Sequence, residues 1–264
     1  MAFTELDLDS LKRIERVISV PWGLEKAGKT SYALSHPAPI YYLDFDLGTE
    51  GVKGVREALE AGRQIYHATY KPKDPESAEE AEATLTQARA DFQEACVSCP
   101  VGGTIVVDTS SQLWELIQAV KLDGPRHRVF KNEIMRAVGE NREPKWLSVD
   151  EAPVPPLDYR GSNRIMHWFH AQALSTPGVN FCFVQSAKEV WAENKPTGNF
   201  KAHGWNNTPY AVQMILYLYK DASIPGAPVF YGRIDECKQD PGLVGLPLQS
   251  VNFELVSGLL FGAK

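Results

Sequence analysis

Residues 23–30 read Gly23-Leu24-Glu25-Lys26-Ala27-Gly28-Lys29-Thr30 and fit the pattern G-x-x-x-x-G-K-[ST] at every fixed position. The residues before them, Ile14 to Val20, alternate in apolar character and predict a strand. The residues after them, Ser31 to Ser35, predict the start of a helix. Strand, loop and helix in this order are the context that the pattern requires. The stretch therefore predicts a phosphate-binding loop in an α/β fold.

Each fixed position of this loop has a physical reason. The two glycines allow a tight turn, so that backbone N–H groups converge on an anion, and the helix that follows adds the positive end of its dipole. We expect Lys29 to reach the β- and γ-phosphates of a nucleotide and the Thr30 hydroxyl to bind Mg²⁺. The predicted nucleotide-binding residues are Gly23, Leu24, Glu25, Lys26, Ala27, Gly28, Lys29, Thr30 and Ser31.

The composition is ordinary for a soluble globular protein, with 44% hydrophobic and 23% charged residues. A chain of 264 residues suits a single domain over residues 1–264, with a core from about 14 to 255. The net charge of −6 argues against a protein that coats nucleic acid over its whole surface, but it leaves room for a local basic groove. The sequence has no long apolar run and no signal-peptide pattern, so we expect a cytoplasmic protein without a membrane partner.

Polar residues end three further apolar stretches. Ile40 to Leu43 runs into Asp44-Phe45-Asp46, and Thr104 to Val107 runs into Asp108. Ligands of open α/β sheets bind at the carboxyl ends of strands, and there Asp108 would accept a hydrogen bond from Thr30 or from Mg²⁺-bound water. Val179 to Val184 ends in Gln185, whose amide is suited to a γ-phosphate or to the attacking water. Asp44, Asp46, Asp108 and Gln185 thus mark one edge of a predicted sheet.

The remaining pattern completes the predicted fold. Helices are expected at 52–61, at 78–95 behind a capping-box signature at Ser77, at 112–122 and at 162–174. Alternating strands at 211–219 and 229–235, with an edge strand at 250–255, predict antiparallel pairing toward the C-terminus. The fold class is therefore α/β, with a mostly parallel central sheet flanked by helices.

Two segments have a composition of their own. Residues 121–161 are basic and rich in proline, which predicts a partly mobile insertion, either a solvated loop or a surface that faces nucleic acid. Residues 187–208 are predicted to form a loop in which cations alternate with aromatic rings, as a single-strand binder requires. The same rings could instead attach the loop to the protein. The candidate DNA-binding residues are Lys188, Trp191, Lys195, Phe200, Lys201 and Trp205.

The order of these motifs resembles that of the RecA-like P-loop ATPases, in particular the short single-domain kind that is common in bacteriophages and is associated with DNA recombination and single-strand annealing. The resemblance covers residues 14–255. It rests on Gly23–Thr30, Tyr42–Asp46, Ile105–Thr109 and Phe183–Ser186.

The resemblance implies an ATPase that uses ATP and Mg²⁺, binds single-stranded DNA and assembles head-to-tail into a ring or filament, with a single-strand-binding protein as a further partner. It makes Asp46 the residue that activates water, although the family usually has Glu there and Glu50 is an alternative. Asp108 becomes the acid near Mg²⁺, and Gln185 the γ-phosphate sensor. The first and second DNA loops would fall within 137–161 and 187–208. The basic residue that completes a neighbour's site would be Arg233 or Lys238.

Two other functions stay open on the sequence. The phosphate loop also occurs in small-molecule and nucleotide kinases, in which the basic stretch 121–145 would be a lid over the phosphates. Alternatively, the protein binds a nucleoside triphosphate to stabilise an assembly and does not hydrolyse it.

Overall fold

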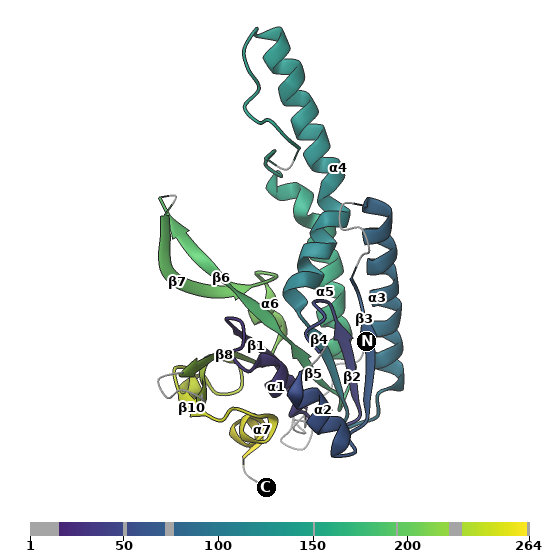
Figure 1. The fold of residues 1–264 in the computed structure, drawn as a ribbon, viewed down its shortest axis with the longest axis vertical. Helices are drawn as coiled ribbons and strands as arrows, with labels where there is room; N and C mark the ends of the chain where they lie inside the picture. The colour runs from purple at the N-terminus through teal and green to yellow at the C-terminus, as the bar shows by residue number, and fades with distance from the viewer. Residues whose placement is uncertain are drawn as a thin grey trace, which may run out of the picture.

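The computed structural model describes residues 16–49, 52–71, 77–149, 151–193, 195–221 and 229–262. Its central sheet has the strand order β10-β9-β8-β1-β5-β4-β2-β3 (Figure 1). Neighbouring strands from β8 to β3 are parallel, and β9 and β10 pair antiparallel beyond β8. The predicted α/β class is confirmed, with a mostly parallel sheet and antiparallel strands toward the C-terminus. The strands are β1 Ile18–Gly23, β2 Ile40–Asp44, β3 Ile65–Thr69, β4 Thr104–Asp108, β5 Asn180–Phe183, β8 Met214–Asp221, β9 Val229–Cys237 and β10 Pro247–Gln249.

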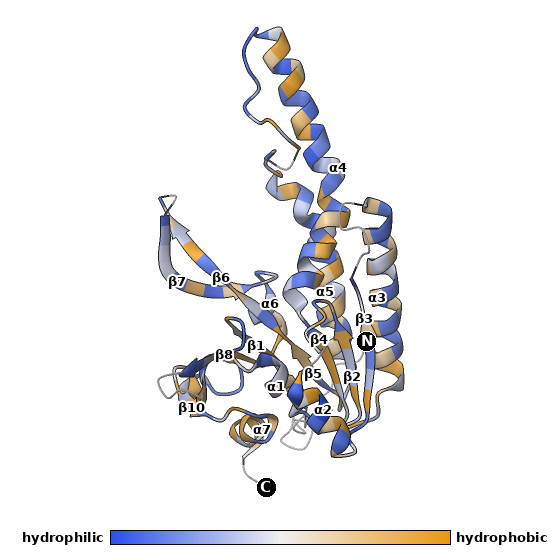
Figure 2. Cartoon of the chain, in the orientation of Figure 1, coloured by the Kyte–Doolittle hydropathy of each residue, from blue (hydrophilic) through white to orange (hydrophobic). Residues whose placement is uncertain are grey.

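Helices cover both faces of this sheet, and β4 contributes side chains to the hydrophobic cores on both faces. Ile105 and Val107 belong to the core under α3, α4 and α5, whereas Val106 lies in the core shared with α1 and α7. This follows from the alternation of side chains along a strand. In Figure 2 the apolar residues accordingly colour β4 and β5 orange. The helices are α1 Lys29–Leu34, α2 Lys53–Glu60, α3 Ala78–Ser98, α4 Ser110–Gly139, α5 Arg160–Ser175, α6 Thr208–Ala211 and α7 Phe253–Phe261, with 3₁₀ turns at Pro156–Tyr159 and Pro241–Leu243.

The predicted start of α3 is confirmed by its cap. The Ser77 hydroxyl accepts a hydrogen bond from the Glu80 backbone N–H at 3.3 Å. Leu85 and Phe92, on the face predicted to be apolar, are buried against the sheet. None of the described helices is long and apolar enough to cross a membrane.

Helix α4 does not end at Leu122 as predicted, so residues 121–139 of the predicted insertion are helical, whereas the described residues between 140 and 155 are irregular. It continues through Pro125 to Gly139, and its far half projects beyond the other helices (Figure 1). Proline costs a helix one hydrogen bond, but tertiary contacts can outweigh that loss. Here Leu122 and Ala137 are buried, and Glu133 accepts hydrogen bonds from the Arg142 side chain and the Lys145 backbone, at 2.7 and 3.1 Å. These contacts fold the returning chain against the helix.

Two further predictions of elements were wrong. Residues 187–208 form no loop, because most of them build the antiparallel hairpin of β6 (Gln185–Ala192) and β7 (Lys195–His203). The predicted edge strand at 250–255 is absent from that stretch, since β10 precedes it and α7 begins within it. Phe253, Leu259 and Phe261 of α7 pack against the core on the α1 face, so the C-terminal apolar residues are docked on their own chain.

Candidate active site

The phosphate loop connects β1 to α1 as predicted, although the strand begins at Ile18 and runs to Gly23. Gly28 precedes α1 with a φ of 91°, a conformation that L side chains rarely adopt. A Cβ at Gly23 would lie 2.2 Å from the Leu218 carbonyl oxygen, so a side chain there would displace the neighbouring strand β8. Both glycines are thus required by the backbone, in addition to any role toward a ligand.

The side chain of Lys29 folds back onto residues 23 and 24 of the phosphate loop. Its ammonium donates to the carbonyl oxygens of Gly23 and Leu24, at 3.0 and 2.7 Å. Burial lowers the pKa of Lys29, and the negative charges of Asp108 and Asp46 act to raise it. Phosphate oxygens would offer this ammonium stronger, charge-assisted hydrogen bonds than two neutral carbonyls do.

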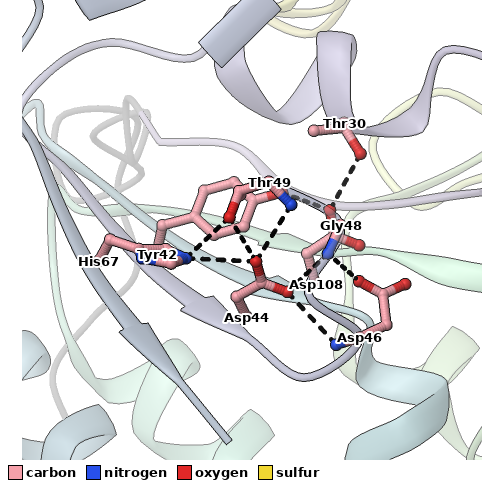
Figure 3. A network of polar contacts seen from close by, with 8 residues as sticks. All are labelled: Thr30, Tyr42, Asp44, Asp46, Gly48, Thr49, His67 and Asp108. Carbon is pink, nitrogen blue, oxygen red and sulfur yellow. Dashed lines mark hydrogen bonds and ion pairs between the residues drawn. The ribbon is translucent and has the colours of Figure 1, made fainter. Parts of the chain in front are cut away.

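Thr30 and Asp108 come together as the sequence predicted. The Thr30 hydroxyl donates to Asp108 Oδ2 at 3.2 Å, and the Tyr42 hydroxyl donates to the same oxygen (Figure 3). Burial raises the pKa of Asp108 to about 7; the hydrogen bond from Tyr42 opposes this shift, and the charges of Asp46 and Asp44 add to it. The side chain is only 2% exposed. A metal ion beside it would favour the ionised form.

The donor set at Thr30 and Asp108 fits Mg²⁺. Hydroxyl and carboxylate oxygens are the ligands that this ion uses, and it usually keeps several waters and binds substrate phosphates besides one or two protein groups. In the part of the chain that the structure describes, no three His, Cys, Asp or Glu side chains gather into a metal-binding group. A site completed by nucleotide and water needs no such group.

Asp46 lies on the turn that follows β2, near Asp108 and Lys29. Its Oδ1 accepts from the Gly48 backbone N–H at 2.8 Å, and burial raises the pKa of Asp46. The alternative residue Glu50 lies outside the described residues.

Buried Asp44 carries a hydrogen-bond network that sequence reasoning missed. Its carboxylate accepts from backbone and side-chain groups of the same turn and approaches His67 Nε2 at 3.2 Å (Figure 3). Thr49, five residues after Asp44, is close enough in sequence to have been found. His67 comes from β3, and only the pairing of β2 with β3 brings it to this site.

Gln185 starts β6 beside the C-terminal end of β1, where it pairs with Trp22. The side chain is buried, and its Nε2 donates to the Thr208 hydroxyl at 3.4 Å. A Cβ on Gly204 would lie 2.4 Å from the same nitrogen. The amide of Gln185 is thus directed toward the segment after the hairpin.

Both candidates for a residue that acts on a neighbouring subunit are held within this chain. Arg233 Nη2 pairs with Asp235 Oδ1 at 2.8 Å, and its guanidinium lies 5.4 Å from the ring centre of Tyr217. The Lys238 ammonium donates to the Tyr210 carbonyl oxygen. The Arg233 side chain keeps 51% of its surface accessible despite these contacts.

The hairpin β6–β7 separates the predicted DNA-binding residues by face. Lys188 pairs with Lys201, and Trp191 pairs with Pro196. The register shifts between Glu189 and Trp191, so the faces follow from the pairs along β6. Side chains alternate along a strand, so Lys188 with its partner Lys201 shares a face with Ala192 and its partner Lys195. Phe200, the partner of Glu189, shares the other face with Trp191 and Pro196. Trp191 is 61% exposed and Phe200 is 38% exposed. The hairpin thus has a lysine face and an aromatic face.

Trp205 is a correction to the predicted DNA-binding set. It is 6% exposed, donates through Nε1 to Asn163 Oδ1 at 3.0 Å, and stacks on His170 with ring centres 5.3 Å apart. A ring enclosed in this way is unavailable for stacking on bases. Trp205 therefore attaches the end of the hairpin to α5, which was the alternative interpretation of these rings.

A cavity of about 530 Å³ opens beside the phosphate loop. Gly28 and Ser31 line one side of it, and Phe230, Tyr231 and Asn252 line another. The volume lies within the range of small-molecule and cofactor sites. A ligand that extends beyond the phosphate loop has room here.

No protein-family model and no curated protein sequence is similar enough to the chain to count as a match. Among solved structures, the fold is similar to the crystal structure of the RadB recombinase, with a TM-score of 0.44 and 13% sequence identity. The superposition covers 88% of this chain and 86% of that one.

Proposed function

We propose that the protein is a RecA-like ATPase that binds ATP and Mg²⁺ at the phosphate loop and hydrolyses the bond between the β- and γ-phosphates. The observation that carries this proposal is the convergence of three elements on one edge of the sheet. Lys29 and Thr30 begin α1, Asp108 ends β4 within 3.2 Å of Thr30, and Asp46 follows β2. The motif order in the sequence supports the same assignment.

Each residue then has a distinct role toward the nucleotide. Backbone N–H groups of residues 24–30 and the Lys29 ammonium bind the phosphates. Thr30 and, through water, Asp108 hold Mg²⁺, which neutralises phosphate charge when bound. Asp46 orients the attacking water and accepts its proton. The cavity beside Gly28 takes the part of the nucleotide beyond the phosphates.

In the same proposal, the hairpin β6–β7 binds single-stranded DNA. The protomers assemble head-to-tail. Exposed lysines suit a phosphate backbone, and exposed Trp191 and Phe200 suit stacking on bases. Arg233 would leave Asp235 to contact a neighbour's nucleotide, where a cation is typically worth 10³–10⁵ in rate. The expected turnover of an isolated protomer is therefore low.

The test is ATP hydrolysis by the purified chain, measured over a range of protein concentrations with and without single-stranded DNA. Turnover per protomer should rise with concentration and with DNA, and Lys29→Ala should abolish it. Trp191→Ala should weaken DNA binding by about 1–3 kcal/mol and leave nucleotide binding unchanged. The exposed ring of Tyr210, in α6, provides the matched control Tyr210→Ala.

The outcomes of this assay separate the alternatives. Bound ATP that stays intact on an assembled protein would support a non-hydrolysing assembly protein instead. Phosphate transfer to a nucleoside or nucleotide without DNA would support a kinase. A rate that is independent of both concentration and DNA would remove the DNA-binding and assembly part of the proposal.

A further inference from the structure

The turn that carries Asp46 is built around the carboxylate of Asp44. Asp44 Oδ1 accepts from the backbone N–H groups of Asp46 and Gly48, at 3.3 and 3.1 Å. Oδ2 accepts from the backbone N–H and the hydroxyl of Thr49, at 3.1 and 2.6 Å (Figure 3). Asp44 is fully buried. One charged side chain thus fixes the backbone from residue 46 to residue 49.

His67 holds this carboxylate from a different strand. Its Nε2 lies 3.2 Å from Asp44 Oδ2 and 2.9 Å from the Thr49 hydroxyl oxygen. A carboxylate can only accept, and the hydroxyl proton of Thr49 is already directed to Asp44. Nε2 must therefore carry the proton and donate. Burial acts to raise the pKa of Asp44, but the donors from Thr49, His67 and Gly48 bring it below its ordinary value.

One backbone amide connects the carboxylate of Asp44 to the carboxylate of Asp46. The Gly48 N–H lies 3.1 Å from Asp44 Oδ1 and 2.8 Å from Asp46 Oδ1, so it links the two carboxylates. A Cβ at position 48 would be 2.6 Å from Asp46 Oδ1, so a side chain there would collide with this carboxylate. The amide of Gly48 therefore fixes where the Asp46 carboxylate lies, and the position of that amide depends on Asp44.

We infer that His67 and Thr49 are positioning residues for Asp46, which act through the buried carboxylate of Asp44. The inference rests on the proposed ATPase function for its effect on rate. Its structural content, that His67 orders the turn at 46–49, holds independently of the reaction. His67 does not touch a reacting atom, so its loss should alter turnover and leave nucleotide binding alone.

The experiment compares His67→Leu with His67→Gln and Tyr66→Leu in the full chain. Leucine removes the donor, whereas the glutamine amide can place an N–H near the position of Nε2. Tyr66 precedes His67 on β3, is 52% exposed and stacks on Tyr41. Its variant therefore controls for damage to the edge strand. A displaced catalytic group can cost as much as 10²-fold in rate, so His67→Leu should lower kcat for ATP by about tenfold to a hundredfold with KM unchanged. His67→Gln should recover most of the loss.

Amide hydrogen exchange supplies the second readout. The amides of Gly48 and Thr49 should exchange at least about tenfold faster in His67→Leu, the equivalent of about 1.4 kcal/mol, and at the wild-type rate in Tyr66→Leu. If exchange changes in this way but the wild-type protein hydrolyses no ATP, the proposed function fails and the positioning role stands. Unchanged exchange in His67→Leu overturns the inference whatever the activity. Loss of kcat in all three variants overturns the role of the His67 donor.

Discussion

At the scale of single residues, the carboxylates near Thr30 differ in how they are stabilised. Asp44 receives several hydrogen bonds that lower its pKa, so it is charged at neutral pH. Asp108 is as deeply buried but receives donors only from Tyr42 and Thr30 among the described residues, and burial raises its pKa to about 7. The chain thus keeps one carboxylate ionised for structure and leaves the other responsive to a bound cation.

This difference predicts a pH dependence of stability for the protein without nucleotide. Below the ordinary pKa of 3.8, Asp108 is protonated in both the folded and the unfolded state, so its ionisation contributes nothing. Between 3.8 and about 7 the unfolded state loses its proton first, so the contribution of Asp108 becomes less favourable as pH rises. A tenfold difference in proton affinity between the two states corresponds to about 1.4 kcal/mol.

Asp108→Asn removes this destabilising contribution. The variant should be more stable than the wild type at pH 8, by about 1 kcal/mol or more, with the difference shrinking toward pH 4. Urea unfolding of both proteins at several pH values measures it. A constant difference across that range would show that Asp108 ionises as freely in the folded chain as in the unfolded one. Mg²⁺ with nucleotide should reverse the order, because only the wild type has a carboxylate for the ion.

At the scale of elements, the first turn of α4 joins the candidate active site to the hairpin. The Ser111 hydroxyl accepts from the Ser186 backbone N–H at 2.9 Å and donates to the His203 carbonyl oxygen. Ser186 lies at the start of β6 and His203 at the end of β7, so one side chain ties both strands of the hairpin. Ser111 is three residues from Asp108 and is buried. The first turn of α4 thus connects Asp108 to the base of the hairpin.

Ser111→Ala should loosen this attachment. The Ser186 amide would lose its acceptor, and because this hydrogen bond is only part-buried, the cost should be about 1 kcal/mol, the lower end of the range for a buried donor. Hydrogen exchange there should therefore accelerate by about fivefold. Stimulation of ATP hydrolysis by DNA should fall with it. Ser175→Ala is the matched control, because that hydroxyl donates to carbonyls of its own helix. Equal exchange at Ser186 in both variants would show that other contacts hold the hairpin.

Local sequence patterns correctly predicted the elements whose structure depends on residues nearby in the sequence. They failed for the elements whose structure depends on contacts with residues far away in the sequence. The Ser77 cap, the apolar face of α3 and the loop at 23–30 depend on short-range chemistry. The predicted end of α4 at Leu122 was wrong because the burial of Ala137 and the return of Arg142 to Glu133 are tertiary contacts, which local patterns do not contain. The ring of Trp205 read as exposed because nothing near it in sequence shows that α5 covers it. His67 was missed for the same reason.

At the scale of the whole molecule, the sheet is held between two groups of helices, and Phe92 lies near the centre of one core. Its ring is fully buried and contacts the rings of Phe169, Phe181 and Phe183, with centres 4.9 to 6.4 Å apart. These rings join α3, α5 and β5. Phe92 therefore links two helices to a central strand that pairs with β4, the strand that ends in Asp108.

Phe92→Ala should lower the free energy of unfolding by about 3–5 kcal/mol, the range for truncation of a buried aromatic ring. Val97, also on α3, is 82% exposed, and Val97→Ala should change stability by less than about 0.5 kcal/mol. Urea denaturation followed by circular dichroism measures both. Similar losses for the two variants would mean that α3 contributes through its helix alone and that its packing is loose.

The long helix that begins beside Asp108 has a mechanical consequence. The 30 residues of α4 extend about 45 Å, so a tilt of about 5° at the first turn displaces the far end by about 4 Å. A small displacement near Thr30 would therefore become a larger displacement at the far end of α4. Paired spin labels at its tip and on the sheet would therefore register, as a change in separation, whether a triphosphate has been exchanged for a diphosphate.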